Sequence, residues 1–299
     1  MVTTGAIRHG DQARHLNFNS EEHPVALQLG GSEPSELAYA TEQARRWGYD
    51  EVNLNCGCPS ERVQRGAFGA CLMNEADLVA SCVRAMVDAA QPACAGQTAL
   101  PITVKHRIGI DREESYSFVR DFVGTVAEAG CEVFIVHARN AWLKGLSPKE
   151  NREIPPLRYD IVYQLKREFP HLTIVLNGGI TQAQEIEHHL QHVDGVMVGR
   201  EAYHNPWIMA DWDQRFWNDR ETPPLDRSHV ERKMVDYMTQ QAQQGVAWAH
   251  VARHMLGLHN GISGARRWRQ TWSDHSRKDQ SPEMVWQAAQ RPQSLKDTT

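Results

Sequence analysis

The sequence lacks any long hydrophobic run, and this absence argues against a helical membrane protein. Its apolar stretches, such as residues 133–136 and 195–198, are only a few residues long, whereas a membrane-crossing helix needs roughly 20 apolar residues. The first ten residues also lack the basic start and apolar stretch of a secretory signal peptide. We therefore expect a cytoplasmic protein that does not enter a membrane.

The sequence also has few cysteines and no net positive charge. The chain of 299 residues has 6 cysteines and a net charge of −5 at pH 7. Cysteines at this density fit free thiols better than a disulfide framework. Because the net charge is negative, any contact with nucleic acid must come from a local basic patch.

A regular series of short aliphatic runs predicts the fold. Hydrophobic residues make up 41% of the chain, which is enough for one large core and a small second domain. Near-continuous apolar runs are typical of parallel strands covered on both faces. They occur at residues 25–29, 51–55, 102–105, 133–137, 173–177 and 193–198. Helical patterns lie between them, at residues 35–47, 75–90, 115–129, 159–169 and 182–189.

Strands that alternate with helices predict βαβ units. These units, with a further strand at residues 1–7, favour an α/β fold of the (β/α)8 TIM-barrel type. The alternative is a doubly wound sheet, but the glycine fingerprint that would follow its first strand is missing. After Trp217 a polar, proline-containing segment leads into a tail with helical periodicity. We predict a barrel domain over residues 1–217 and a helical domain over residues 225–299.

Polar side chains or glycines end nearly every predicted strand. Catalytic groups of TIM-type barrels lie at the carboxyl ends of the strands. A single polar residue there is usually a capping or structural residue, but a barrel built only for stability would not need one on almost every strand. The sequence therefore predicts an active site formed by these residues: Gln28, Asn55, Lys105 with Arg107, His137 with Arg139, Asn177-Gly178-Gly179, and Gly199-Arg200.

The last two of these strand ends have the parts of a phosphate site. Gly178 and Gly179 allow the backbone to approach an anion, the following helix points amide hydrogens at it, and Arg200 adds a fixed charge. Barrels commonly bind phosphate at this place, although tight turns alone are the alternative. Lys105, inside a predicted strand, also needs an anionic partner, such as an electron-rich cofactor ring.

The most specific stretch runs from residue 53 to residue 73. Its Asn55-Cys56-Gly57-Cys58-Pro59 segment resembles the strand-end Asn-x-Gly-Cys-Pro motif of the tRNA-dihydrouridine synthases, and its Gly-Ala-Cys-Leu-Met ending is similar to the A type of that family. The resemblance covers residues 1 to about 275, with further matches at residues 104–107, 136–139, 176–180 and 254–258.

The resemblance implies an enzyme that uses FMN and NADPH to reduce uridines in the D loop of tRNA, at positions 20 and 20a. It implies that Cys58 is the general acid. This role is chemically coherent, because hydride adds to C6 of uracil and C5 must then be protonated, which a thiol can do at neutral pH. The resemblance further implies that FMN is held by Gln28, Lys105, His137, Asn177, Gly178, Gly179, Gly199 and Arg200.

The resemblance also implies a tRNA interface. The implied contact residues are Asn55, Lys149, Arg152, Arg266 and Arg269. Apart from Asn55, they lie in a loop at residues 142–152 and in a basic segment at residues 264–270, either of which would otherwise be read as solvated surface. A uridine inside folded tRNA must be flipped out of its stack to reach a barrel mouth. We expect a monomer that binds the tRNA D loop and no protein partner.

Some readings stay open. Cys56 and Cys58 do not predict a metal site, because a zinc site needs a second ligand pair of suitable spacing. The family pattern begins with a strand that ends in an Ala-Pro-Met type motif, and we expect this first strand to be absent here. Two other functions remain as alternatives: an FMN barrel oxidoreductase that acts on a small molecule, and a truncated, non-catalytic tRNA-binding remnant.

Overall fold

The computed structural model describes residues 1–60, 63, 66, 68–92, 98–219, 221 and 223–290. They form two compact units: residues 1–180 with 184–197, and residues 181–183 with the described residues from 198 onward. Within these residues no helix is long and apolar enough to cross a bilayer. Parts of the sequence analysis fall outside the described residues, namely Glu61, Arg62, Gln64, Arg65 and Ala67 of the motif stretch, and Cys94.

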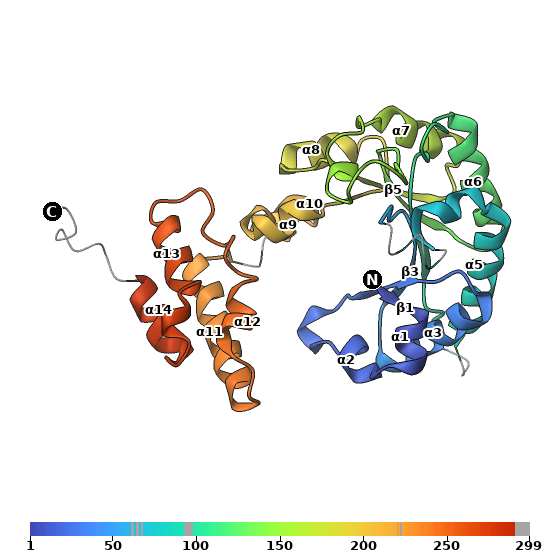
Figure 1. The fold of residues 1–299 in the computed structure, drawn as a ribbon. Helices are drawn as coiled ribbons and strands as arrows, with labels where there is room; N and C mark the ends of the chain where they lie inside the picture. The colour runs from blue at the N-terminus through green and yellow to red at the C-terminus, as the bar shows by residue number, and fades with distance from the viewer. Residues whose placement is uncertain are drawn as a thin grey trace. The chain divides into compact units, whose positions relative to one another are not determined.

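The first unit is built on one parallel sheet whose strands follow chain order. Helices lie along the outer side of this curved sheet (Figure 1). The succession of parallel strands and outer helices is that of a TIM-type barrel, which confirms the predicted α/β fold. The strands are β1 (Val2–Thr3), β2 (Ala26–Gly30), β3 (Glu51–Cys56), β4 (Ile102–Arg107), β5 (Val133–His137), β6 (Thr173–Asn177) and β7 (Gly195–Met197).

Strand β3 is apolar on the helix-facing side and polar at alternate positions. In β3, Val52, Leu54 and Cys56 share one face and are fully buried, whereas Asn53 and Asn55 lie on the other. The covering helices are α1 (Thr4–His9), α2 (Gln12–Leu16), α3 (Pro34–Trp47), α5 (Ala76–Ala90), α6 (Tyr116–Glu128), α7 (Tyr159–Glu168) and α8 (Ala183–His189), with 3-10 turns η1 (Ser20–Glu22), η2 (Gly69–Asn74) and η3 (Glu150–Arg152).

The strand predicted over residues 1–7 is wrong for most of its length. β1 ends at Thr3 and helix α1 begins at Thr4. The Thr3 side chain accepts a hydrogen bond from the Ala6 backbone N–H at 3.3 Å, so Thr3 acts as a helix N-cap. This capping bond, together with Ile7 buried on the inner side of the helix, outweighs the strand pattern that the β-branched residues suggest.

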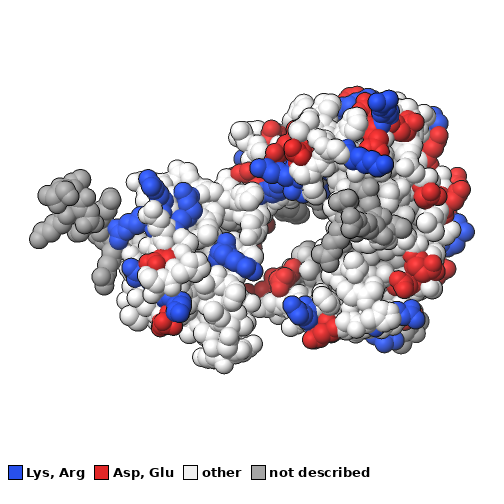
Figure 2. Space-filling view, in the orientation of Figure 1, with Lys and Arg blue, Asp and Glu red and all other residues white. Residues whose placement is uncertain are grey.

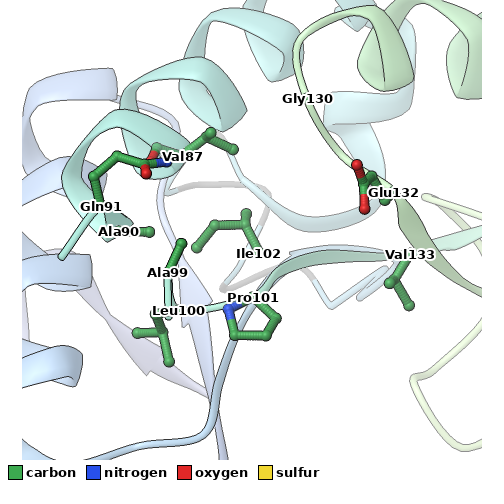
Figure 3. Close-up of a pocket in the computed structure, with 10 residues that line it drawn as sticks. All are labelled: Val87, Ala90, Gln91, Ala99, Leu100, Pro101, Ile102, Gly130, Glu132 and Val133. Atoms are coloured by element: carbon green, nitrogen blue, oxygen red, sulfur yellow. The ribbon is translucent and has the colours of Figure 1, made fainter. Parts of the chain in front are cut away.

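A pocket of about 280 Å³ lies at the amino ends of β4 and β5. Its wall includes Ile102 and Val133, where these strands begin, and Val87 near the end of α5 (Figure 3). Glu132 is the one ionisable side chain in its described lining. The pocket therefore lies at the opposite end of the strands from the predicted active-site residues.

The second unit is helical. Its core contains Trp248, Trp268 and Trp272 together with Val235 and Met238, all buried. This helical character agrees with the periodicity of the tail. Its elements are α9 (Arg200–His204), η4 (Pro206–Met209), α10 (Trp212–Phe216), α11 (Arg227–Gln243), α12 (Trp248–Ala252), α13 (Ala265–Trp272), η5 (His275–Arg277) and α14 (Pro282–Gln290). The domain limits 1–217 and 225–299 remain a proposal, and residues 291–299 lie outside the described part.

One buried carboxylate organises this helical unit. Glu231 is fully buried and pairs with His259. It also accepts hydrogen bonds from the Trp286 indole N–H at 2.8 Å and from Gln290 Nε2 at 2.5 Å. The His259 ring stacks on Trp268 with 4.4 Å between the ring centroids. A buried charge is tolerated when it is paired and hydrogen-bonded in this way, and here the pairing connects α11, α13 and α14.

Candidate active site

Strand register brings predicted residues together at the carboxyl ends of the first unit's strands. Asn55 on β3 is the neighbour of Lys105 on β4. One layer further on, Arg107 on β4 is the neighbour of His137, and His137 is the neighbour of Asn177 on β6. These side chains therefore surround one region, as carboxyl ends of parallel strands do in barrel enzymes.

Asn55 holds the loop that carries Cys58. Its Oδ1 atom accepts hydrogen bonds from the backbone N–H groups of Gly57 at 3.1 Å and of Cys58 at 3.0 Å. This local side-chain to backbone pairing is characteristic of asparagine at a turn. The backbone carbonyl of Cys58 in turn accepts from Ala70 N–H at 2.9 Å. The half-buried thiol is thus attached to a loop that is fixed on both sides.

A chain of hydrogen bonds connects this loop to the interior of the sheet. Asn55 Nδ2 donates to Gln28 Oε1 at 2.9 Å, and Gln28 Nε2 donates to Asn53 Oδ1 at 2.7 Å. Asn53 Nδ2 then donates to Thr103 Oγ1 at 2.8 Å, and Thr103 donates to Glu51 at 2.5 Å. Every amide in this chain is oriented by its neighbours. Gln28 and Asn55 are therefore preorganised rather than loose polar groups.

Lys105 is a buried cation whose hydrogen-bond partner is neutral. Its Nζ atom donates to Asn177 Oδ1 at 3.1 Å, and Asn177 Nδ2 donates to the Met197 carbonyl at 2.8 Å. Burial lowers the pKa of Lys105 to about 8, and Arg107 acts in the same direction. Part of the residue's surface is still accessible. Within the described residues no carboxylate contacts it, which fits an anionic ligand.

Gly178 and Gly179 adopt left-handed backbone conformations beside His137. Their φ angles are +121° and +75°. A Cβ atom on Gly178 would lie 2.7 Å from the His137 ring, and one on Gly179 would lie 2.6 Å from Leu157. The Tyr159 hydroxyl donates to the Gly178 carbonyl at 2.8 Å. Both the backbone angles and the close approach therefore require glycine, and Tyr159 fixes the turn.

Two further predicted residues, Gly199 and Arg200, lie where helix α9 begins. They belong to the second unit, where Gly199 is exposed and precedes α9, and Arg200 is exposed as the first residue of that helix. Their predicted contact with a phosphate group stays a prediction.

The two segments predicted to bind tRNA belong to different units. Lys149 and Arg152 are exposed, on and next to the turn η3 of the first unit. In the second unit Arg266 is exposed on α13, and Arg269 Nη1 donates to Asn260 Oδ1 at 2.7 Å. Trp268 and Trp272 of the same helix are buried. Lys and Arg side chains stand on the visible face of this unit with few acidic groups between them (Figure 2).

The structure adds residues that the sequence analysis did not select. Asn53, Thr103, Tyr159 and Asn151 are all hydrogen-bonded around the predicted site. One signal could have found the first two, because polar residues recur every second position in two otherwise apolar strands. Nothing local marks Tyr159 or Asn151, because the partners of both side chains are backbone groups. Among the described residues no three His, Cys, Asp or Glu side chains are grouped to hold a metal ion.

A curved parallel sheet with polar groups gathered at its carboxyl ends is the arrangement of TIM-type barrel enzymes. Residues 1–294 match the dihydrouridine synthase (Dus) family, and the chain belongs to that family. It is 55% identical over 282 residues to the tRNA-dihydrouridine(20/20a) synthase of Vibrio cholerae, covering 93% of this chain and 82% of that protein. It is 56% identical over 279 residues to the proteins of the same name from Salmonella typhi and Escherichia coli (strain K12), covering 93% of this chain and 81% and 78% of theirs.

Proposed function

We propose that this protein reduces uridine to 5,6-dihydrouridine at positions 20 and 20a in the D loop of tRNA, with FMN as cofactor and NADPH as reductant. The observation that carries the proposal is the position of Cys58. Asn55 fixes its loop at the carboxyl end of β3, next to the buried cation Lys105. The names of the similar proteins support the same reaction and the same tRNA positions.

The described residues fit an anionic flavin. Lys105 has a neutral hydrogen-bond partner and a pKa lowered to about 8 by burial, so a bound anion would stabilise its charged form. His137 and Asn177 come from the neighbouring strands β5 and β6, the backbone of Gly178 and Gly179 follows β6 beside His137, and Gln28 comes from β2. The side chains and glycine backbone named in this paragraph would hold FMN. When bound, FMN would receive a hydride from NADPH and pass it to the uridine. Gly199 and Arg200 would hold its phosphate.

Cys58 would provide the proton for the other half of the reduction. As hydride reaches C6 of the uracil ring, C5 takes up a proton, which breaks the S–H bond and leaves a thiolate. The thiolate of Cys58 interacts favourably with both Lys105 and Arg107, since it raises the pKa of each. Two basic side chains therefore lie near the sulfur atom that gives up the proton, and water can restore the thiol afterwards.

The tRNA would be held by residues on both units. Lys149 and Arg152 supply positive charge near the Cys58 loop, and Arg152 is close enough to Arg107 to lower the pKa of that guanidinium. Arg266 and Arg269 supply charge on α13. Phosphate contacts of this kind orient an RNA without reading its sequence, while Asn55 at the mouth would contact the flipped uridine.

Nucleoside analysis tests the proposed function directly. The purified protein, supplied with FMN, NADPH and unmodified tRNA, should form dihydrouridine that maps to positions 20 and 20a. A tRNA with cytidine at those positions is the matched control and should remain unchanged. Reduction of small molecules without any dihydrouridine in tRNA would instead favour a different FMN oxidoreductase. A protein that binds tRNA but retains no flavin would favour a non-catalytic role.

Changing Arg266 and Arg269 to alanine should weaken tRNA binding in a salt-dependent way. Removal of one phosphate-binding side chain reduces the steepness of log K against log salt by about 0.7–0.9. NADPH oxidation by the flavin should be unaffected. Binding isotherms at several salt concentrations measure the effect, with Arg84→Ala as control because Arg84 is exposed on α5. Equal affinities of the double variant and the wild type at low and moderate salt would assign the two arginines to ordinary solvated surface.

A further inference from the structure

Arg107 connects two loops that are far apart in sequence. It is the last residue of β4 and is 3% exposed. Its Nε atom donates to the Gly57 carbonyl at 3.2 Å, directly before Cys58. Its Nη1 atom donates to the Asn151 carbonyl at 2.9 Å and to the Asn140 carbonyl at 3.4 Å. One planar guanidinium thus holds the Cys58 loop and both ends of residues 140–151.

Asn151 closes the second loop from inside. Its side chain is fully buried. Its Oδ1 accepts from the Trp142 backbone N–H at 2.7 Å, while its Nδ2 donates to the carbonyls of Trp142 at 2.9 Å and Leu146 at 3.2 Å. Lys149 and Arg152 flank it on the exposed side. The position of these two basic residues and the position of the Asn151 carbonyl are therefore set by the same side chain.

No acidic group explains why a cation is buried here. In the described part of the chain no carboxylate pairs with Arg107, whose pKa burial lowers to about 10, while the thiolate of Cys58 acts in the opposite direction. A buried guanidinium without a counter-ion is costly. A neutral side chain could pack at this place, but only arginine presents donors in a rigid fork that can join carbonyls from two directions.

We propose that Arg107 and Asn151 are positioning residues that couple the Cys58 loop to the loop carrying Lys149 and Arg152. The inference rests on the proposed function for its biological purpose, because binding of tRNA phosphates at Lys149 and Arg152 would then place the acid. Asn151 has no exposed surface, so it acts through the backbone groups that it holds. A displacement of its carbonyl passes through the guanidinium to Gly57 and so to the thiol.

The test measures the reactivity of Cys58 in the full chain. The alkylation rate with iodoacetamide is followed peptide by peptide by mass spectrometry, with Cys71 in the same protein as internal reference. Asn151→Ala should change the Cys58 rate by about threefold or more, the range expected for coupled sites, and leave Cys71 unchanged. Arg107→Lys keeps the charge but loses the fork, and should change the Cys58 rate similarly. Asn17→Ala, at an exposed asparagine, is the matched control.

The double variant decides whether the two residues act together. If Asn151→Ala has already released the carbonyl from the guanidinium, adding Arg107→Lys should change the Cys58 rate by less than it does in the wild type. The coupling would be overturned if the fold-change in the Cys58 alkylation rate of the double variant equalled the product of the two single fold-changes. It would also be overturned if a folded Asn151→Ala protein had an unchanged Cys58 rate. In turnover, Asn151→Ala should mainly raise the KM for tRNA and Arg107→Lys should mainly lower kcat. Absence of any dihydrouridine with the wild type would defeat the proposed function, while the alkylation result would still decide the coupling.

Discussion

Replacing Cys58 with alanine should slow uridine reduction by about 10²- to 10⁴-fold, the usual contribution of a positioned general acid. The reason is that C5 of the uracil ring would then have to take its proton from water. Flavin content and NADPH oxidation in the absence of tRNA should stay at wild-type values, because the thiol takes no part in loading the flavin with hydride. Single-turnover formation of dihydrouridine, measured at saturating tRNA, gives the effect.

Two further cysteine variants separate acidity from packing. Cys58→Ser keeps nearly the same size but has a hydroxyl, whose proton is far harder to remove, so it should be almost as slow as Cys58→Ala. Cys56→Ala is the control from the same motif. The Cys56 thiol is fully buried on the helix-facing side of β3, so its loss should have a much smaller effect. Full dihydrouridine formation by Cys58→Ala would remove this residue from the mechanism.

Replacing Lys105 with methionine should weaken FMN binding by about tenfold or more, because charge-assisted contacts to an anion are the strong ones. The same change should make the flavin-free protein more stable. At pH 7 the buried ammonium has no acidic partner among the described residues, and an apolar side chain of similar length removes its desolvation cost, on the order of 1–3 kcal/mol. Flavin fluorescence titration measures the first effect, and denaturant unfolding of the flavin-free protein measures the second.

The pH dependence of both effects follows from the lowered pKa. Lys105 has a pKa of about 8 in the folded protein, against an ordinary value of 10.5. Below pH 8 the folded state carries the full cost of the charge. Between about pH 8 and 10.5 the unfolded chain binds more protons, so stability rises with pH through this window. The affinity for FMN should fall as the pH rises through the same range, because the ammonium that attracts the anion loses its proton.

Lys144→Met is the matched control for the lysine. Lys144 is exposed, so its replacement should change stability by less than about 0.5 kcal/mol and leave the pH dependence of FMN binding as in the wild type. If Lys105→Met destabilised the flavin-free protein, the ammonium would have to be satisfied by contacts other than the neutral Asn177 oxygen. If it also retained FMN normally, the assignment of Lys105 to the cofactor would be wrong.

The sequence by itself predicted most of the element types in the first unit, although residues 4–7 of the first predicted strand form a helix. The predicted strands 133–137 and 173–177 agree with β5 and β6 residue for residue, and those at β3 and β4 differ only at their ends. Parallel strands that are covered on both faces are largely apolar, so their burial can be predicted from the local composition. The Asn55–Pro59 motif likewise identified the family that the comparisons establish.

Only the tertiary structure decided which groups hold one another. The register that makes Asn55 a neighbour of Lys105 is a relation between strands about 50 residues apart along the chain, and no local pattern encodes it. The same is true of Arg107 and Asn151, whose partners are backbone carbonyls and amides. Every residue offers the same backbone groups, so sequence cannot mark which of them a buried side chain will meet. The periodicity of apolar residues in the sequence predicts which side chains are buried, whereas the packing of the folded chain decides which groups they bond to.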